Sequence, residues 1–295
     1  MDGERLKLSD TKNWLILISV FFIALDLFVW NEIIFNGKNK NPEIYFLNVG
    51  QGDSELVALP DKVKVLIDGG PDKKILGNIS SIFSYFDRRI DLVIMSHPQL
   101  DHFGGLMEIF KRYDVGAFIW SGEKTGAASF QELEKTARQN KIPELFLAEG
   151  DKIKYQGNIF EILSPAKNST SIKNINDDAL VIKFTSQNNG KVLFTADIDD
   201  KVEKYLSQKY DLTADILKVA HHGSKYSSSL EFLKSVLPKI SIIEVGKNSY
   251  GHPTKAALAR LSDIGSKIFR TDKNGIIKMV LDNNKVNVFT QNNGN

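Results

Sequence analysis

The chain has 295 residues, of which 42% are apolar and 25% charged, and it contains no cysteine. This composition excludes a disordered chain, and the absence of cysteine excludes disulfides, iron–sulfur clusters, thiolate metal sites and cysteine nucleophiles. A bound metal therefore has only His, Asp, Glu, Asn or Gln side chains as ligands, which favours Zn, Mn, Mg or Fe. The formal net charge of +2 is too small to indicate a nucleic-acid partner by itself.

The first feature along the chain is a long apolar segment. Residues 14–35 are mostly apolar, and their most apolar part, Trp14–Trp30, contains a single charged residue, Asp26. At about 1.5 Å per residue the segment reaches roughly 33 Å as a helix, enough to cross a bilayer core. No small-residue cleavage site follows, so we predict an uncleaved transmembrane anchor after an N-terminal tail over residues 1–13. An amphipathic or buried first helix is the alternative.

Basic residues flank the predicted anchor on both sides. Those before it are Arg5, Lys7 and Lys12, and those after it are Lys38 and Lys40. Because cytoplasmic flanks carry the excess of positive charge, this small difference favours a single-pass cell-membrane protein with its N-terminus inside. The globular part would then lie outside the cytoplasmic membrane. Residues 36–42 are polar and end in a proline, which predicts a short linker.

The rest of the chain is predicted to form one globular domain over residues 43–290, followed by a polar tail over 291–295. Predicted strands cover residues 44–49, 54–59, 63–67, 91–96, 117–120, 158–163, 179–185, 191–195, 216–220, 240–244, 267–270 and 276–281. Predicted helices cover residues 74–86, 106–113, 130–139, 200–210, 230–236 and 254–264. Strands on both sides of a helix-containing middle predict a layered α/β domain with sheets in the centre and helices outside.

The segment Ser96-His-Pro-Gln-Leu-Asp-His102 follows an apolar strand, and the Phe-Gly-Gly sequence after it opens a helix. It places two imidazoles and a carboxylate within one short loop. A loop of this kind aims these groups at one point, as coordination of a divalent metal requires. The alternative is a polar loop that only caps a helix.

Three later segments repeat this arrangement of an apolar strand followed by potential ligands. One strand is followed by Asp197, the next by His221 and His222, and a third leads to a turn that contains His252. A carboxylate at the end of one strand is weak evidence, because many strands end in Asp. Together with the first loop, however, the three segments predict a metal-dependent active site.

Six short motifs follow one another along the chain: Val49-Gly-Gln-Gly-Asp53, Ile67-Asp-Gly-Gly70, Ser96–His102 with Gly104-Gly105, Thr195-Ala-Asp197, His221-His-Gly-Ser224 and Tyr250-Gly-His-Pro253. In this order they resemble the motifs of the metallo-β-lactamase superfamily, and more narrowly those of the metallo-β-lactamase-like domain of ComEC-type competence proteins. The resemblance covers Glu43–Thr290 and implies a four-layer αββα sandwich with the metal site at one edge of the two sheets. It also implies metal-dependent phosphodiester hydrolysis, with a role in degrading one DNA strand during uptake.

The resemblance further implies a set of metal ligands. These are His97, Gln99, Asp101, His102, Asp197 and His222. Asp101, His102 and His222 would hold one ion, and Asp197 would bridge to a second. This chain departs from the family at Gln99, a neutral and weaker ligand, and it lacks the usual separate histidine before the strand that leads to Asp197. We therefore expect one firmly held Zn or Mn ion and a second, weakly held one.

The resemblance assigns catalytic roles to Asp101, His221 and His252. Asp101 would orient the attacking water, His221 would hydrogen-bond the scissile phosphate, and His252 would lie near the substrate phosphate. Supporting positions around the ions are Asp53, Asp68, Asn176 and Asp178. Of these, Asp68 is expected to orient a metal ligand.

Basic residues are frequent in the C-terminal third of the chain. They are Lys218, Lys225, Lys247, Lys255, Arg260, Lys267, Arg270, Lys273 and Lys278. If several of them face the cleft, they attract a polyanion such as DNA in a salt-dependent way. A solvated surface of mixed charge is the alternative.

The sequence favours a membrane-anchored phosphodiesterase or nuclease that acts on DNA during uptake. A second hypothesis is a hydrolase of another substrate, such as a phosphocholine ester, a cyclic dinucleotide or a β-lactam. A third is a catalytically weakened DNA-binding partner of an uptake channel. A ComEC-like channel needs many spanning helices and this sequence predicts one, so the expected partners are DNA, the membrane and a separate ComEC-like channel protein.

Overall fold

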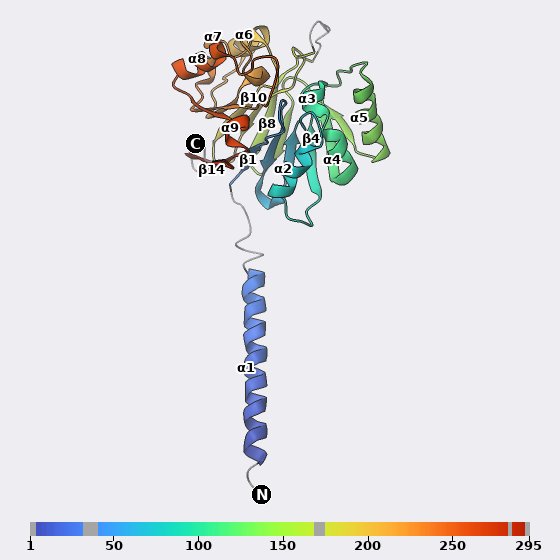
Figure 1. The fold of residues 1–295 in the computed structure, drawn as a ribbon, viewed down its shortest axis with the longest axis vertical. Coiled ribbons are helices and arrows are strands. Elements are labelled where there is room, and N and C mark those ends of the chain that lie inside the picture. Colours follow the sequence, from blue (N-terminus) through green and yellow to red (C-terminus); the bar gives the residue numbers. More distant parts are fainter. Residues whose placement is uncertain (1–3, 32–40, 168–174, 283–284, 293–295) are drawn as a thin grey trace. The chain divides into compact units, whose positions relative to one another are not determined.

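The computed structural model describes residues 4–31, 41–167, 175–282 and 285–292 (Figure 1). The chain separates into an N-terminal helix, α1 (Glu4–Asn31), and a globular domain that begins at Asn41. Parts of the predicted tails, anchor and linker, including Lys38 and Lys40, lie outside the described residues. The predicted boundaries of these segments therefore stay predictions.

Helix α1 is long and apolar enough to cross a membrane. Its window Asn13–Trp30 has 18 residues and a mean hydropathy of 2.1, and none of it is buried within the structure. The alternative of a buried first helix is therefore not supported. Membrane anchors and signal sequences share this kind of N-terminal helix, so its length and composition alone are weak evidence for an anchor.

The domain contains two β-sheets. The first has the strand order β15-β14-β1-β2-β3-β4-β5-β6, and the second has the order β13-β12-β11-β10-β9-β8-β7. Strands of the first sheet are β1 (Glu43–Phe46), β2 (Glu55–Ala58), β3 (Lys64–Ile67), β4 (Arg89–Ile94), β5 (Asp114–Trp120), β6 (Glu144–Phe146), β14 (Ile277–Asp282) and β15 (Lys285–Thr290). Those of the second are β7 (Lys152–Tyr155), β8 (Asn158–Ser164), β9 (Val181–Thr185), β10 (Lys191–Phe194), β11 (Ile216–Lys218), β12 (Ile240–Ile243) and β13 (Lys267–Arg270).

Helices cover the outer faces of both sheets. They are α2 (Lys74–Ile82), α3 (Leu100–Phe103), α4 (Leu106–Arg112), α5 (Ala128–Gln139), α6 (Asp200–Lys209), α7 (Leu230–Val236), α8 (Lys255–Asp263) and α9 (Thr271–Asn274). Figure 1 shows α6, α7 and α8 gathered on one side of the domain and α2, α4 and α5 on the other. The predicted four-layer αββα sandwich is thus confirmed.

Three apolar clusters hold the four layers together, because strands buried on both faces carry apolar residues on both. Side chains such as Phe46 and Phe194, whose ring centroids lie 6.2 Å apart, fill the space between the sheets. Alternate residues such as Leu66 point outward and pack against α2, α4 and α5. A third cluster, which includes Leu217, packs α6, α7 and α8 onto the second sheet.

Most predicted elements are present, with small differences at their ends. The helix predicted over residues 74–86 ends at Ile82, because Phe83 is extended (ψ 149°) and Tyr85 and Phe86 are 81% and 90% exposed. Strands β6, β7 and β15 were not predicted. Each is the outermost strand of its sheet, where charged residues interrupt the apolar pattern by which strands are recognised.

Candidate metal centre

The topology brings the predicted ligands to one edge of both sheets. Strands β3 and β4 run parallel, as do β10, β11 and β12, so the segments after these strands leave the sheets in common directions. Asp68 follows β3, His97 follows β4 and Asp197 follows β10. Strand β2 is antiparallel to β3, and its first residue, Glu55, pairs with the last residue of β3. Asp53 comes just before β2 and therefore lies at the same edge. A chain of alternating elements thereby gathers distant residues in one place.

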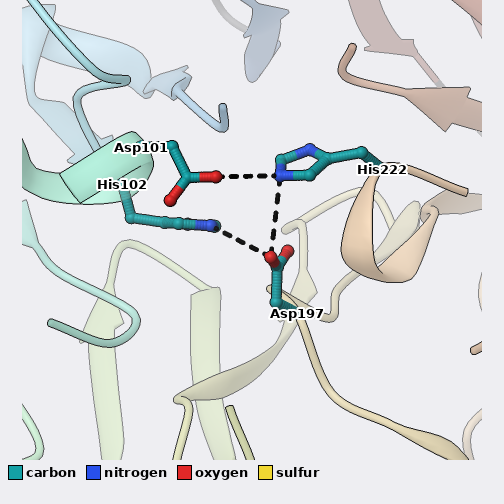
Figure 2. A group of neighbouring side chains, drawn as sticks. All are labelled: Asp101, His102, Asp197 and His222. Carbon is teal, nitrogen blue, oxygen red and sulfur yellow. Dashed lines mark hydrogen bonds and ion pairs between the residues drawn. The ribbon is translucent and has the colours of Figure 1, made fainter. Parts of the chain in front are cut away.

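Four side chains converge at this edge, as Figure 2 shows: Asp101 and His102 from α3, Asp197 after β10 and His222 after β11. One ligand atom of each residue lies within 4.8 Å of those of the other three. His102 Nε2 is 3.4 Å from Asp197 Oδ2, and His222 Nε2 is 3.4 Å from Asp101 Oδ2 and 3.6 Å from Asp197 Oδ2. We call these four residues the ligand cluster.

Hydrogen bonds on the far side of each imidazole direct its Nε2 atom into the ligand cluster. His102 Nδ1 lies 2.8 Å from Asp68 Oδ2. Asp68 is itself held by the backbone N–H and the hydroxyl of Ser96, at 2.7 and 2.6 Å. His222 Nδ1 lies 2.8 Å from the carbonyl oxygen of Glu244 and 3.2 Å from Asp53 Oδ1. Such contacts fix both the tautomer and the orientation of metal-binding histidines.

The turn that carries His221 and His222 has an unusual backbone. Both residues have positive φ, at 51° and 53°, and Gly223 follows with a φ of 82°. A Cβ atom on Gly223 would lie 2.6 Å from the Cβ of Pro253. Glycine is therefore required here for both conformation and space, and it lets the turn carry His222 into the ligand cluster.

The residues of the ligand cluster fit a divalent ion. Two imidazole nitrogens and two carboxylates are a donor set that Zn and Mn accept. Among the buried polar atoms of the described residues, His102 Nε2 and the nearby His97 Nε2 have no hydrogen-bond partner. Buried polar groups without a partner are costly, and a cation at the centre of the cluster would remove that cost.

Charge also organises the ligand cluster. Burial disfavours the charged imidazolium of His222, but Asp197 and Asp53 outweigh burial and raise its pKa to about 10. The pKa of His102 is raised well above its usual value for the same reasons. Burial opposes ionisation of Asp101, yet its hydrogen bond to His222 lowers its pKa to about 2. A bound cation must therefore displace protons from the two imidazoles, which makes metal affinity dependent on pH.

An open cavity of about 420 Å³ leads to the ligand cluster. Asp101, Asp197 and His222 line it together with His221 and His252. The imidazoles of these last two residues lie 5.6 Å apart between their centroids, and His221 Nε2 is 3.9 Å from Asp197 Oδ2. Both predicted phosphate-contacting histidines thus border the space that a substrate would enter.

Known proteins share the sequence pattern and the fold of this domain. A family model described as Metallo-beta-lactamase superfamily matches residues 47–166. The domain has the metallo-beta-lactamase fold, and this matched part is similar to the superfamily in sequence. Solved structures share its fold: the metallo-beta-lactamase fold protein YhfI from Bacillus subtilis has a TM-score of 0.54 at 13% identity and covers 81% of this chain and 100% of its own. Zn²⁺-bound PqqB from Methylobacterium extorquens has a TM-score of 0.51 at 11% identity and covers 79% and 87%.

The curated relatives of this domain include competence proteins, which confirms the narrower resemblance. ComE operon protein 3 of Bacillus subtilis (strain 168) is 28% identical over 257 residues, which are 80% of this chain and 32% of that protein. Competence protein ComA of Neisseria gonorrhoeae is 29% identical over 239 residues, 79% of this chain and 31% of that protein. The chain therefore spans about a third of the length of these relatives.

The residues of the predicted second metal position lie beside the ligand cluster. The imidazole of His97 is fully buried and its centroid lies 4.1 Å from that of His102. Burial, reinforced by the charge of His102, lowers the pKa of His97 to about 3, so this imidazole is a neutral donor. Gln99 also lines the cavity, and its amide nitrogen donates a hydrogen bond to Asn176. The amide oxygen of Gln99, the atom that would bind a metal, is a neutral donor, and the expected weaker second position stays a prediction.

The supporting residues do not all lie at this cavity. Asp53 and Asp68 contact the histidines of the ligand cluster, as described above, and Asn176 lines the same cavity. Asp178 instead lines a separate cavity of about 290 Å³, together with residues that include Tyr205. Its predicted place beside the weaker metal position stays a prediction.

Lys218, one of the nine basic residues of the C-terminal third, is not available to attract DNA at the surface. Its side chain is fully buried, and its ammonium group donates to Asp53 and, at 2.9 Å, to the carbonyl oxygen of Ala196. It also lies 3.8 Å from Asp197 Oδ1. Burial disfavours the charge, but Asp53 and Asp197 outweigh it and raise the pKa of Lys218. Lys218 is therefore a permanent buried cation behind the ligand cluster.

Several other basic residues of the C-terminal third also have structural contacts. Arg270 pairs with Asp272 at 2.7 Å, and Lys278 pairs with Glu43 at 2.8 Å. Arg260 donates to backbone carbonyl oxygens in the loop before α7. The exposed lysines that remain are Lys225, Lys247, Lys255, Lys267 and Lys273. Some of the nine basic residues therefore have structural roles and the others are solvated. Fewer than nine positive charges are available on the surface to attract DNA.

Two buried glutamates lie behind the ligand cluster and were not predicted as part of the site. Carboxylate oxygens of Asp53, Glu55 and Glu244 lie within 4.8 Å of one another. Burial, followed by repulsion from Asp53, raises the pKa of Glu55 to about 8, and burial with repulsion from Glu55 raises that of Glu244 well above its usual value. Each glutamate lies at the end of a strand at this edge, as the predicted ligands do. This position in the sequence could have identified both glutamates as part of the site.

The raised pKa of Glu55 gives the folding stability a defined pH dependence. In the unfolded chain Glu55 ionises near its ordinary pKa of 4.5, whereas in the fold it keeps its proton to about 8. Its contribution to stability is therefore complete below the unfolded pKa and is lost as the pH rises through the folded one, by up to about 1.4 kcal/mol per pH unit. We expect Glu55→Gln to flatten this decline in urea unfolding of the full chain in detergent.

The exposed Glu231→Gln is the matched control, because its carboxylate is solvated in the fold. It should leave the pH dependence unchanged. An identical decline in wild-type protein and Glu55→Gln would show that Glu55 is ionised in the folded state at neutral pH, against this expectation.

Proposed function

We propose that this chain is a membrane-anchored, metal-dependent phosphodiesterase that acts on DNA during uptake. The observation that carries the proposal is the convergence of Asp101, His102, Asp197 and His222 at the inner end of an open cavity. Members of the metallo-beta-lactamase superfamily are typically metal-dependent hydrolases, and the similarity to competence proteins supports DNA as the substrate.

The residues of the cavity have separate roles in this proposal. A divalent ion held by the ligand cluster would supply a Lewis acid that makes water a competent nucleophile near neutral pH. Asp101 is the most exposed of the four ligands, with 32% of its side chain accessible, and it would orient that water. His221 and His252 on the cavity wall would donate hydrogen bonds to the phosphoryl oxygens as negative charge develops there.

We also propose that α1 anchors the domain to the cell membrane, with the domain outside the cytoplasm and a separate channel protein beside it. The 18-residue apolar window of α1 supports the anchor. The similarity to competence proteins supports a place beside a channel for DNA. Recovery of a polytopic membrane protein with the tagged full chain from detergent-solubilised membranes tests the channel partner.

Hydrolysis of DNA by the full chain tests the proposed activity. The protein is purified in detergent without chelators and incubated with Mn²⁺ or Zn²⁺ and end-labelled single-stranded or duplex DNA. We expect cleavage between about pH 6 and pH 9, abolished by EDTA. Parallel assays with a phosphocholine ester, a cyclic dinucleotide and a β-lactam test the other hydrolase reactions. Faster turnover of any of these would overturn DNA as the substrate.

A catalytically weakened DNA-binding partner is the second candidate, and Gln99 is the residue that favours it. Its neutral amide is a poorer ligand than a carboxylate and is engaged with Asn176. Tight DNA binding that chelators leave unchanged, without turnover under any of these conditions, would establish this second function in place of the first.

A further inference from the structure

A large aromatic side chain lies exposed at the cavity that leads to the ligand cluster. Tyr250 lines the same cavity as His221 and Asp197, yet 74% of its surface is accessible. Its ring centroid is 5.9 Å from that of His252, which in turn is 5.6 Å from that of His221. The ring therefore stands next to the two histidines proposed to contact the substrate phosphate.

The loop that carries Tyr250 is held in place by its neighbours. The side-chain amide of Asn248 donates to the carbonyl oxygens of Gly246 and His252, both at 2.9 Å, and accepts a hydrogen bond from the His252 N–H at 3.0 Å. The Thr254 N–H donates to the carbonyl oxygen of Gly223 at 2.9 Å, which ties the loop to the turn of His222. The aromatic ring is thus presented by a preorganised loop, so a ligand need not order it on binding.

The Tyr250 ring lies where the nucleoside next to a bound phosphate would be. Asp197 and His222 are only 1% and 2% exposed, so a phosphodiester must enter the cavity to reach them. The nucleoside attached to that phosphate then remains at the cavity wall, where His252 and Tyr250 lie. Every base has a flat face that stacks on an aromatic ring regardless of sequence, but in a duplex that face is covered by neighbouring bases.

We propose that Tyr250 is a base-stacking subsite for the nucleotide beside the scissile phosphate and that it selects single-stranded nucleic acid. This inference rests on the proposed function for the phosphate position and adds the class of substrate. A quaternary ammonium group, as in phosphocholine, also binds aromatic faces, but it is usually enclosed by several rings. The described cavity wall contains Tyr250 as its single tyrosine or tryptophan.

The test measures binding separately from hydrolysis. Dissociation constants are determined for the full chain in detergent with Mn²⁺ and a labelled, hydrolysis-resistant phosphorothioate single strand. We expect Tyr250→Ala to weaken binding by about 5- to 150-fold, the loss of one stacked base, and Tyr250→Phe to restore it. The same loss should disappear when the oligonucleotide carries abasic sites, because no base is then present to stack.

The matched control is Tyr85→Ala, which removes another exposed tyrosine (81%), from the loop between α2 and β4. It should bind the strand like the wild type. Equal affinities for Tyr250→Ala and wild type, an undiminished loss on the abasic strand, or tighter binding of phosphocholine than of the strand would each overturn the subsite. If Tyr250→Ala weakens binding as expected but the wild-type chain hydrolyses no DNA, the proposed activity is overturned and the stacking subsite is still supported.

Discussion

Asp197→Asn is expected to lower kcat/KM for DNA hydrolysis by at least about 10³-fold, equivalent to roughly 4 kcal/mol of transition-state stabilisation. Asp197 Oδ2 lies within 3.4 and 3.6 Å of the two imidazoles of the ligand cluster, so this carboxylate is central to the site. Asparagine preserves the shape but removes the negative charge that a divalent ion requires. Initial rates on a single-stranded oligonucleotide across metal concentrations measure the effect.

The matched control for this substitution is Asp263→Asn, at the exposed end of α8. It changes the same atoms far from the ligand cluster and should retain wild-type rates. Circular dichroism and unfolding of both variants show whether a lost activity reflects a lost fold. A folded Asp197→Asn variant with more than about a tenth of the wild-type kcat/KM would contradict a metal-assisted reaction at this site.

Lys218→Met is expected to destabilise the fold by about 3–5 kcal/mol, which is the usual cost of removing one partner of a buried ion pair. Methionine fills a similar volume, but Asp53 is then left as a buried carboxylate without its cation. The loss should extend beyond stability, because Asp53 also lies 3.2 Å from His222 Nδ1. Urea unfolding of the full chain in detergent measures the free energy, and metal titration measures the effect on the site.

Two further variants separate charge from packing at Lys218. The double variant Lys218→Met/Asp53→Asn should recover part of the stability, since no buried charge then lacks a partner. Lys234→Met, on the exposed face of α7, should be neutral within about 0.5 kcal/mol. A Lys218→Met variant as stable as the wild type would mean that the buried ion pair does not form in solution.

The sequence predicts that the four residues of the ligand cluster lie close together, because each of them follows an apolar strand. Strand ends and glycine turns are recognisable locally, and parallel strands deliver Asp197 and His222 to the same edge as Asp101 and His102. Their contacts with one another depend on how the two sheets pack, which no single motif contains. The resemblance to a family provided that missing information.

Lys218 shows what a count of basic residues does not reveal. Charge alone suggests a surface residue, but β11 is buried on both faces, with Ile216 pointing between the sheets and Leu217 toward the helices. Alternation along the strand places Lys218 on the same face as Ile216. A lysine in that position must be buried and paired, and its partner, Asp53, lies 165 residues earlier in the chain.

The metal content of the chain tests the central claim most directly. Full-length protein purified without chelators, and then dialysed against Zn²⁺ or Mn²⁺, is expected to hold one ion per chain firmly and a second weakly. His222→Ala should lose the firm ion, whereas His221→Ala, one residue earlier on the same turn, should keep it. A wild-type chain that retains no ion, or a His222→Ala variant that binds as tightly as wild type, would contradict the assignment of this site.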